Sequence, residues 1–336
     1  KAQAMMLDSH FGLEQQVRCS SNLFFNFNGT AGIWRTDAII DAGHWSADTL
    51  TEDLDLSYRA QLKGWKMLYL NEHGCAGELP ADMAAFKSQQ HRWAKGGVQV
   101  MKKMLGTVWR SSFSLKHKVE ASFHLSNNLA YLVMMIDSVC LLLPSLFARE
   151  YLQLETILWI DLPMLLLASA SHLIYLFFGQ VALGHSKTAA MLKLPRLLLI
   201  GIQLAYNNAK AGIEALRGQE SEFVRTPKSG ELLQKGQNNL SQNHALQTKD
   251  KQNAGGETSS LSFYQAVTPK GVGFELMIAA VFLGVAVWAM VNQVWLMLPV
   301  LSFLIVGFTA TAAENVVCQI KARRNVDLTN GDQVIN

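Results

Sequence analysis

Four apolar stretches in the last two thirds of this 336-residue chain constrain its fold more than any other feature. They are residues 125–147, 157–183, 272–291 and 294–313. Each supplies the roughly 20 residues that an α-helix needs to cross a hydrocarbon layer about 30 Å thick. Because little more than Asn292-Gln293 separates the last two stretches, they predict a tight transmembrane hairpin.

The first two stretches carry polar residues that a membrane-spanning helix seldom exposes to lipid. Asn127, Asn128 and Asp137 interrupt the first stretch, and Asp161 and His172 interrupt the second. Polar groups at that depth usually face the interior of a helix bundle or an aqueous path. A buried helical hairpin in a soluble protein is the alternative for these two stretches.

The positions of Lys and Arg predict the orientation of the chain in the membrane. If both hairpins return to the side from which they enter, residues 1–120, 184–271 and the tail after Glu314 share one side. Nearly all Lys and Arg residues lie in these regions, and the loops on the far side hold only Arg149. Since cytoplasmic loops are enriched in Lys and Arg, the shared side is predicted to be cytoplasmic. We expect a bacterial inner membrane, with a Golgi membrane as the alternative.

A further apolar segment, residues 191–216, has a polar stripe at helical spacing. The stripe consists of Lys193, Arg196, Gln203, Asn207, Lys210, Glu214 and Arg217. An amphipathic helix of this kind lies in the plane of the membrane interface rather than across it. We therefore predict an interfacial helix here.

Composition narrows the classes of partner and site. Charged residues make up only 16% of the chain, against roughly 25% in soluble domains. The net charge of +3 is too small to indicate a nucleic-acid partner, and no basic-aromatic binding pattern is present. The four Cys residues lie far apart in the sequence, so they suggest neither a disulfide framework nor a zinc site.

These features divide the chain into six parts. They are a front domain at 1–120, a hairpin at 121–183, the interfacial helix with its following loop at 184–228, a flexible polar insert at 229–271, a second hairpin at 272–314 and a tail at 315–336. Residues 1–18 are expected to form a helix from the middle of a domain. We therefore expect the chain to be a fragment of a longer protein.

The front domain is predicted to be α/β. Residues 23–34 and 65–70 have the aromatic and apolar content of buried strands, and a helix is expected between them. Thr49 and Glu52 have the spacing of a capping box, with Thr51 as the alternative N-cap. Strand, helix and strand in succession are typical of α/β domains.

Three acids, Glu52, Asp53 and Asp55, fall in the first turn of that helix. One interpretation is that they only complement the helix macrodipole. The other is that one of them is a general base, kept ionised and aimed in a fixed direction by the helix start, with lowered basicity. On this second interpretation Asp55 remains a capping residue.

A second helix is predicted after Pro80, which can occupy a first helical position. Gln89, Arg92 and Trp93 stand at i, i+3 and i+4 and share one face. A guanidinium forks onto phosphate oxygens, an amide both donates and accepts, and an indole can stack on a sugar ring. The alternative is a helix with Trp93 in the core and Arg92 in solvent.

Together these motifs resemble the membrane-bound family-2 glycosyltransferases, which include cellulose synthase and hyaluronan synthase. The matching segments are Asn28-Gly29-Thr30-Ala31-Gly32, Thr51-Glu52-Asp53 and Gln89-Gln90-His91-Arg92-Trp93, in the family's order and spacing. The cellulose-synthase-like mannan and glucan synthases look closest. The resemblance implies the C-terminal half of a GT-A-type, Rossmann-like domain, followed by a transmembrane bundle with an interfacial helix. His44 departs from the pattern, because the family usually has Gly there.

The resemblance also implies roles for individual residues. Asp53 would be the base that deprotonates the acceptor hydroxyl, with Glu52 orienting it. Gln89 and Arg92 would hold the nucleotide diphosphate, and Trp93 would stack under the acceptor sugar. The other substrate-binding positions implied are Gln90, Asn28, Gly29 and Thr30, together with Phe223, Thr226 and Lys228 of a sequence similar to the family's gating loop.

The reaction implied is an inverting, processive transfer from a nucleotide sugar to a β-linked glucan or mannan, which is extruded across the bilayer. The donor would be UDP-glucose or GDP-mannose, and the cofactor Mg²⁺ or Mn²⁺. The family's D-x-D metal ligands would lie upstream of Lys1, so we expect no metal site in this chain and no activity from it alone. The alternatives are a non-processive transferase with a lipid acceptor and an inactive truncated membrane protein.

Overall fold

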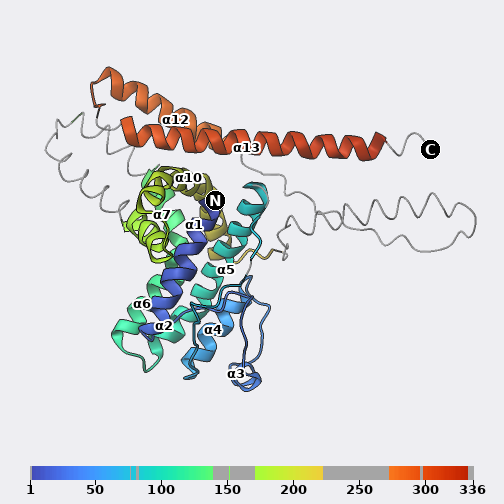
Figure 1. Cartoon of the computed structure of the whole chain (residues 1–336). Helices are drawn as coiled ribbons and strands as arrows, with labels where there is room; N and C mark the ends of the chain where they lie inside the picture. The colour runs from blue at the N-terminus through green and yellow to red at the C-terminus, as the bar shows by residue number, and fades with distance from the viewer. Residues whose placement is uncertain are drawn as a thin grey trace, which may run out of the picture.

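A computed structural model describes residues 2–75, 77–80, 83–138, 151, 171–221, 272–295 and 298–331. Figure 1 shows helices of the front part gathered around one long helix, with a helical hairpin along one side of them. Residues 139–150, 152–170 and 222–271 lie outside the described residues. Most of the first two apolar stretches, the polar insert and Phe223, Thr226 and Lys228 therefore stay predictions.

The opening segment is helical, as expected. The helix α1 (Ala2–Ser9) continues into a π-helix, η1 (His10–Gln15), and then into α2 (Gln16–Ser20). A π-helix is rare and often occurs at functional sites. The apolar helix Ser171–Ala182 packs on this run, where Gly179 lies against Ser9.

The two expected strands are irregular in the structure. No β-strand occurs in the described ranges, so the α/β architecture stays a prediction. The backbone at Phe25 and Phe27 is paired instead with side chains of α4 (Glu52–Leu62). Gln61 Nε2 donates to Phe25 O at 2.7 Å, and Phe27 N donates to Ser57 Oγ at 2.9 Å. Ser57 and Gln61, one helical turn apart, thereby fix the chain that leads into the turn at 28–32.

The start of α4 agrees with the alternative prediction in its position. Thr51 is the N-cap residue, as that alternative stated, but its side chain makes no capping hydrogen bond. The hydroxyls of Thr49 and Thr51 are both buried, with no hydrogen-bond partner in the described part of the chain. The capping box is therefore wrong, because this loop is held by another helix: Leu50 N donates to Gln99 Oε1 at 2.9 Å.

The central helix is α5 (Met83–Arg110), which begins after Pro80 and not at it. Val98, Met104 and Val108 of α5 pack with Tyr58 of α4 and Leu125 of α6 (Leu115–Ser126) in the largest apolar core of the front part. Burying an apolar side chain of this size contributes roughly 1.5–3 kcal/mol. A short helix α3 (Thr36–Asp41) precedes α4, and the chain continues after α6 through η2 (Asn127–Leu129) and α7 (Ala130–Ile136).

The predicted interfacial segment forms α10 (Lys187–Leu216). Two residues of its polar stripe bind other helices: Asn207 Nδ2 donates to Lys87 O of α5 at 2.9 Å, and Gln203 Nε2 donates to Glu314 Oε1 at 3.4 Å. Arg196 and Arg217 of the stripe are exposed. Within the described residues, α10 is by length and composition one of three helices that could cross a membrane, with Gly273–Val291 and Leu298–Val317. Its interfacial position stays a prediction.

The two apolar helices predicted at 272–291 and 294–313 form and pack together, and their passage through a membrane stays a prediction. The helices α12 (Val272–Val291) and α13 (Leu298–Gly331) lie side by side in Figure 1. Gln293 adopts a left-handed φ of 61° in the turn, and the rings of Phe282 and Phe308 stack at 6.0 Å. The helix α13 runs past residue 313, where the apolar stretch ends.

Candidate active site

The three matched motifs meet where the start of α4 faces α5. Gly29 has a φ of 73°, and a Cβ placed on it would lie 3.2 Å from Asp53 Oδ2. On the opposite side, a Cβ on Gly96 of α5 would lie 2.5 Å from Thr51 Cγ2. Glycine at these two positions lets the turn at 28–32 and the helix α5 approach the Thr51–Asp53 segment closely.

The backbone of Asp53 is held by α4 itself. Ser57 Oγ donates to Asp53 O at 2.6 Å and accepts from Phe27 N at 2.9 Å. Asp53 Oδ1 accepts from Leu54 N at 2.8 Å. Since Ser57 binds both segments, the carboxylate of Asp53 keeps a set position relative to the turn that begins at Asn28.

Burial raises the pKa of Asp53 from 3.8 to about 6. The hydrogen bond from Leu54 N lowers this pKa, the charge of Glu52 raises it, and the charge of Arg92 lowers it again. The sequence predicted lowered basicity from the helix start, which is wrong, because desolvation outweighs the favourable backbone dipoles. Asp53 is thus mostly ionised at pH 7 yet more basic than a solvated carboxylate, as suits a general base.

The guanidinium of Arg92 lies near the same acids. Burial lowers the pKa of Arg92, and the charges of Glu52 and Asp53 raise it. The guanidinium nevertheless stays charged, since its usual pKa lies above 12. In the structure, Arg92 therefore lies close enough to Glu52 and Asp53 for their charges to interact, although the two motifs are about forty residues apart in sequence.

The remaining motif residues of α5 sit at the protein surface around Arg92. Gln89, Gln90 and Trp93 are each half-buried, so the indole of Trp93 is not enclosed in the core. Gly29 and Thr30 are exposed. The proposed contacts of these side chains with substrate stay predictions.

Asp55 is not a capping residue. Its side chain is 0% exposed and forms ion pairs with Arg59 at 2.8 Å and with Lys103 of α5 at 3.0 Å. Lys103 also pairs with Asp48 at 2.8 Å. Asp55 points away from the helix N-terminus into this ionic cluster, which ties α4 and the loop before it to α5.

Arg59 also explains the unusual position of His44. Arg59 Nη2 donates to His44 O at 2.9 Å, and His44 adopts a φ of 61° directly after Gly43 at 86°. The left-handed region costs a non-glycine residue roughly 1–2 kcal/mol, which is why Gly suits this position better.

Glu214 of α10 connects that helix to α5. It lies 3.2 Å from Lys95 Nζ and 3.3 Å from His91 Nε2, and Lys95 is only 1% exposed. Burial lowers the pKa of His91, and the charge of Glu214 raises it. His91 and Lys95 flank Arg92 along α5. Their ion pairs with Glu214 therefore fix the position of this part of α5 relative to α10.

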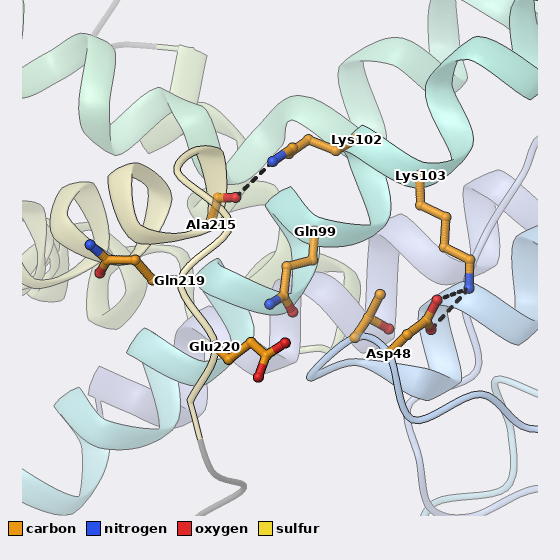
Figure 2. Close-up of a pocket in the computed structure, with 9 residues that line it drawn as sticks. Asp48, Gln99, Lys102, Lys103, Ala215, Gln219 and Glu220 are labelled. Atoms are coloured by element: carbon orange, nitrogen blue, oxygen red, sulfur yellow. Dashed lines mark hydrogen bonds and ion pairs between the residues drawn. The ribbon is translucent and has the colours of Figure 1, made fainter.

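An open pocket of about 390 Å³ lies beside the Thr51–Asp53 loop, between α5 and the end of α10. Figure 2 shows the Gln99 side chain extending from α5, with Lys102 reaching Ala215 and Lys103 reaching Asp48. Lys102 donates to the carbonyls of Ala215 and Leu216 and so caps the end of α10. The pocket does not include Asp53 or Arg92.

Sequence reasoning missed several residues that build this site. Gly96 follows Arg92 by four residues and so shares its face, which was an available signal. Gln99 and Lys103 reach partners about fifty residues away, and no local pattern marks them. No group of three or more His, Cys, Asp or Glu that could hold a metal occurs among the residues with described positions.

Comparisons with known proteins agree with the motif geometry. The profile described as glycosyl transferase family group 2 matches residues 2–183. Glucomannan 4-beta-mannosyltransferase 7 of Arabidopsis thaliana is 40% identical over 148 residues, which are 43% of this chain and 27% of the relative. Glucomannan 4-beta-mannosyltransferase 2 of the same plant is 49% identical over 111 residues, which are 33% of this chain and 21% of the relative.

A probable glucomannan 4-beta-mannosyltransferase 9 of Oryza sativa subsp. japonica is 50% identical over 105 residues, which are 31% of this chain and 20% of the relative. This chain thus spans only 20–27% of the length of these curated relatives. No solved structure matches the chain. The family profile covers more than half of the chain, including Asp53, Arg92 and the residues around them. The chain belongs to glycosyl transferase family group 2.

Proposed function

We propose that this protein is an inverting, processive glycosyltransferase that adds mannose from GDP-mannose to a β-linked mannan or glucomannan and extrudes the product. One observation carries the proposal: a half-buried carboxylate, Asp53, has its pKa raised to about 6 beside the guanidinium of Arg92. A base and a fixed cation at one place suit a reaction in which an alcohol attacks and a diphosphate leaves. The names of the relatives favour a mannosyl donor over UDP-glucose.

In the proposed reaction, Asp53 Oδ2 takes the proton of an acceptor hydroxyl. The hydroxyl oxygen forms a bond to the anomeric carbon from the face opposite the leaving group. The bond from that carbon to the diphosphate oxygen breaks, and the diphosphate leaves with both electrons. Arg92 neutralises part of the negative charge that develops on the diphosphate.

The acids near Asp53 do not assemble a site for a divalent metal. Asp55 is paired with Arg59 and Lys103, and Asp48 is paired with Lys103, so Glu52 is the remaining carboxylate beside Asp53. The described residues hold no cluster with three metal-ligating side chains. The residues present therefore do not fit a Mg²⁺ or Mn²⁺ site, and no step of the proposed reaction depends on one.

For the whole protein we propose the architecture that the family resemblance implies. Residues 1–120 would be the C-terminal half of a cytoplasmic GT-A-type domain, and the apolar helices would form a multi-pass membrane region. In the part of the chain that the structure describes, three helices are long and apolar enough to cross a membrane, which supports this arrangement. The Lys and Arg distribution supports the cytoplasmic side for Asp53 and Arg92.

The test measures sugar transfer by the full-length protein in membrane vesicles, with radiolabelled GDP-mannose or UDP-glucose as donor. We expect polymer from GDP-mannose that β-mannanase digests, and a loss of about 10²-fold or more in the Asp53→Asn variant. Asp37→Asn is the matched control, because Asp37 is also an acid in the first turn of a helix but is exposed. It should leave transfer unchanged.

Two results would contradict the proposal. Near-normal polymer synthesis by the Asp53→Asn variant would remove Asp53 from the role of base. A product of one or two sugars on a lipid, at every donor concentration, would show a non-processive transferase.

A further inference from the structure

A partly buried polar network lies beside the turn at 28–32, and the proposed reaction does not use it. The π-helix η1 directs His10, Glu14 and Gln15 to one place, where they meet Asn26 and Asn28. Gln15 is 0% exposed. Buried polar side chains cost stability unless they are hydrogen-bonded, so this network requires good geometry to be tolerated.

Backbone carbonyls set the orientation of two amides in the network. Gln15 Nε2 donates to Asn26 O at 3.1 Å, and Asn26 Nδ2 donates to Phe27 O at 3.3 Å. A carbonyl only accepts, so the amide nitrogens must be on these sides. The same two nitrogens then donate to Asn28 Oδ1, at 3.4 Å from Gln15 and 2.9 Å from Asn26.

His10 completes the contacts around the Asn28 amide oxygen. His10 Nε2 lies 3.1 Å from Asn28 Oδ1 and 3.2 Å from Gln15 Nε2, while Nδ1 lies 3.0 Å from Glu14 Oε2. A ring with both protons donates to Glu14 and Asn28, and a ring without the Nε2 proton accepts from Gln15 instead. In either state the imidazole bridges Glu14 and the Gln15–Asn28 pair.

Glu14 holds the outer side of this network. Burial alone would raise the pKa of Glu14, but the hydrogen bond to His10 and the charges of His10 and Arg18 together lower it below its usual range. The ionised carboxylate accepts from Arg18 Nε at 2.9 Å and from Tyr175 Oη at 3.3 Å. His10 is therefore fixed by a carboxylate that is itself held from two other helices.

These contacts leave the amide nitrogen of Asn28 available for another partner. Asn28 Oδ1 contacts His10, Gln15 and Asn26, whereas no residue in the described ranges accepts a hydrogen bond from Asn28 Nδ2. Asn28 is only half-buried, and the next residue, Gly29, abuts Asp53 Oδ2. The amide is thus held in one orientation, with its donor atoms unused, one residue away from the proposed base.

We propose that His10 and Gln15 are positioning residues that orient Asn28, so that its Nδ2 donates a hydrogen bond to a hydroxyl oxygen of the acceptor sugar. The inference rests on the proposed function, because it assigns a saccharide acceptor to the site at Asp53. Holding the acceptor through a neighbouring oxygen aims the reacting hydroxyl at the carboxylate of Asp53. Glu14 keeps His10 in place and has no contact with substrate.

The test is a double-mutant cycle on the affinity for β-1,4-mannohexaose and β-1,4-cellohexaose. It uses the full-length protein in detergent, with tryptophan fluorescence as the binding signal. Asn28→Asp keeps the shape and removes the donor, while Gln15→Leu and His10→Phe remove the orienting groups. Each single variant should bind the hexaose about 10-fold more weakly, the scale of one lost hydrogen bond, while the affinity for GDP stays unchanged.

The cycle separates positioning from a merely structural effect. If Gln15 acts through Asn28, the Gln15→Leu/Asn28→Asp double variant should bind no more weakly than Asn28→Asp alone. Tyr58→Phe is the matched control, because the Tyr58 Oη to His124 Nδ1 hydrogen bond of 2.7 Å is also buried but does not touch Asn28. This variant should lower thermal stability and leave hexaose affinity unchanged.

Every result decides the inference. Hexaose affinity that is unchanged in Gln15→Leu and His10→Phe, or losses that add in the double variant, would overturn it. So would the failure of the unmodified protein to bind either hexaose. If that protein binds a hexaose but transfers no sugar, the proposed function is wrong. The hexaose affinities of the variants then still test the positioning role of His10 and Gln15.

Discussion

Gly96 of α5 lies directly against Thr51, so that a Cβ on Gly96 would come within 2.5 Å of Thr51 Cγ2 and 2.9 Å of Thr51 N. Three residues further along α5, Gln99 binds the backbone of Leu50. Since Arg92 precedes Gly96 by one helical turn, α5 positions both the proposed base and its cationic neighbour. The distance between these two groups is thus controlled by the contact of one helix with one loop.

Gly96→Ala should displace this loop and impair the site. Thr51 N is a backbone atom, so relief requires movement of the main chain that leads into Asp53. We expect a loss of about 1–3 kcal/mol in the free energy of unfolding and at least about a tenfold loss of sugar transfer. Thermal unfolding and transfer assays on the full-length protein measure the two effects.

Gly106→Ala on the same helix is the control for that variant. Gly106 is exposed, and its nearest neighbour would be the far end of the Arg110 side chain at 3.3 Å. Alanine there should stabilise the helix by roughly 0.5–1 kcal/mol and leave transfer unchanged. Equal behaviour of the two variants would show that the contact with Thr51 is unimportant.

The raised pKa of Asp53 predicts the pH dependence of transfer. A general base works only when it is deprotonated, so the rate should fall as the pH drops through about 6, with a slope of one on a logarithmic scale. The charge of Glu52 raises this pKa, so Glu52→Gln should move the half-maximal pH downward. A profile whose midpoint lies near 4 in the unmodified protein would contradict the burial of Asp53 in the working enzyme.

Arg92 and Trp93 should affect different substrates although they are adjacent. Arg92→Ala should weaken GDP binding by roughly 10-fold or more, because a charge-assisted contact to phosphate is lost. Trp93→Ala should abolish elongation and leave GDP affinity almost unchanged, since the indole is assigned to the acceptor sugar. Titration with GDP and assays of product length measure these effects, and equal loss of GDP affinity in both variants would refute the division of roles.

The Lys95–Glu214 pair should stabilise the packing of α5 on α10 only while both partners are present. Glu214→Gln leaves the charge of Lys95 buried without its carboxylate partner, at a cost of roughly 3–5 kcal/mol. Lys95→Met combined with Glu214→Gln should recover much of that loss, as measured by thermal unfolding. A double variant less stable than Glu214→Gln alone would show that Lys95 does not depend on Glu214.

The family and the pair of apolar helices at 272–313 were predictable from local features of the chain. The spacing of Gln89, Arg92 and Trp93 and the acids after Thr51 led to the family that the profile confirms, and hydropathy led to the two helices. Helical periodicity and hydropathy are properties of short segments, so they can be evaluated without knowledge of the rest of the fold.

Contacts between distant segments decided the rest. Burial reversed the expected shift in the pKa of Asp53, and Asp55, predicted to be a cap, pairs with Lys103 of α5 instead. Gln203 and Asn207 of α10 bind α13 and α5, and His10, at the start of η1, contacts Asn28 in a distant turn. Desolvation and ion pairing depend on which surfaces meet in the folded protein. Local sequence spacing cannot predict contacts between residues that lie far apart in the chain.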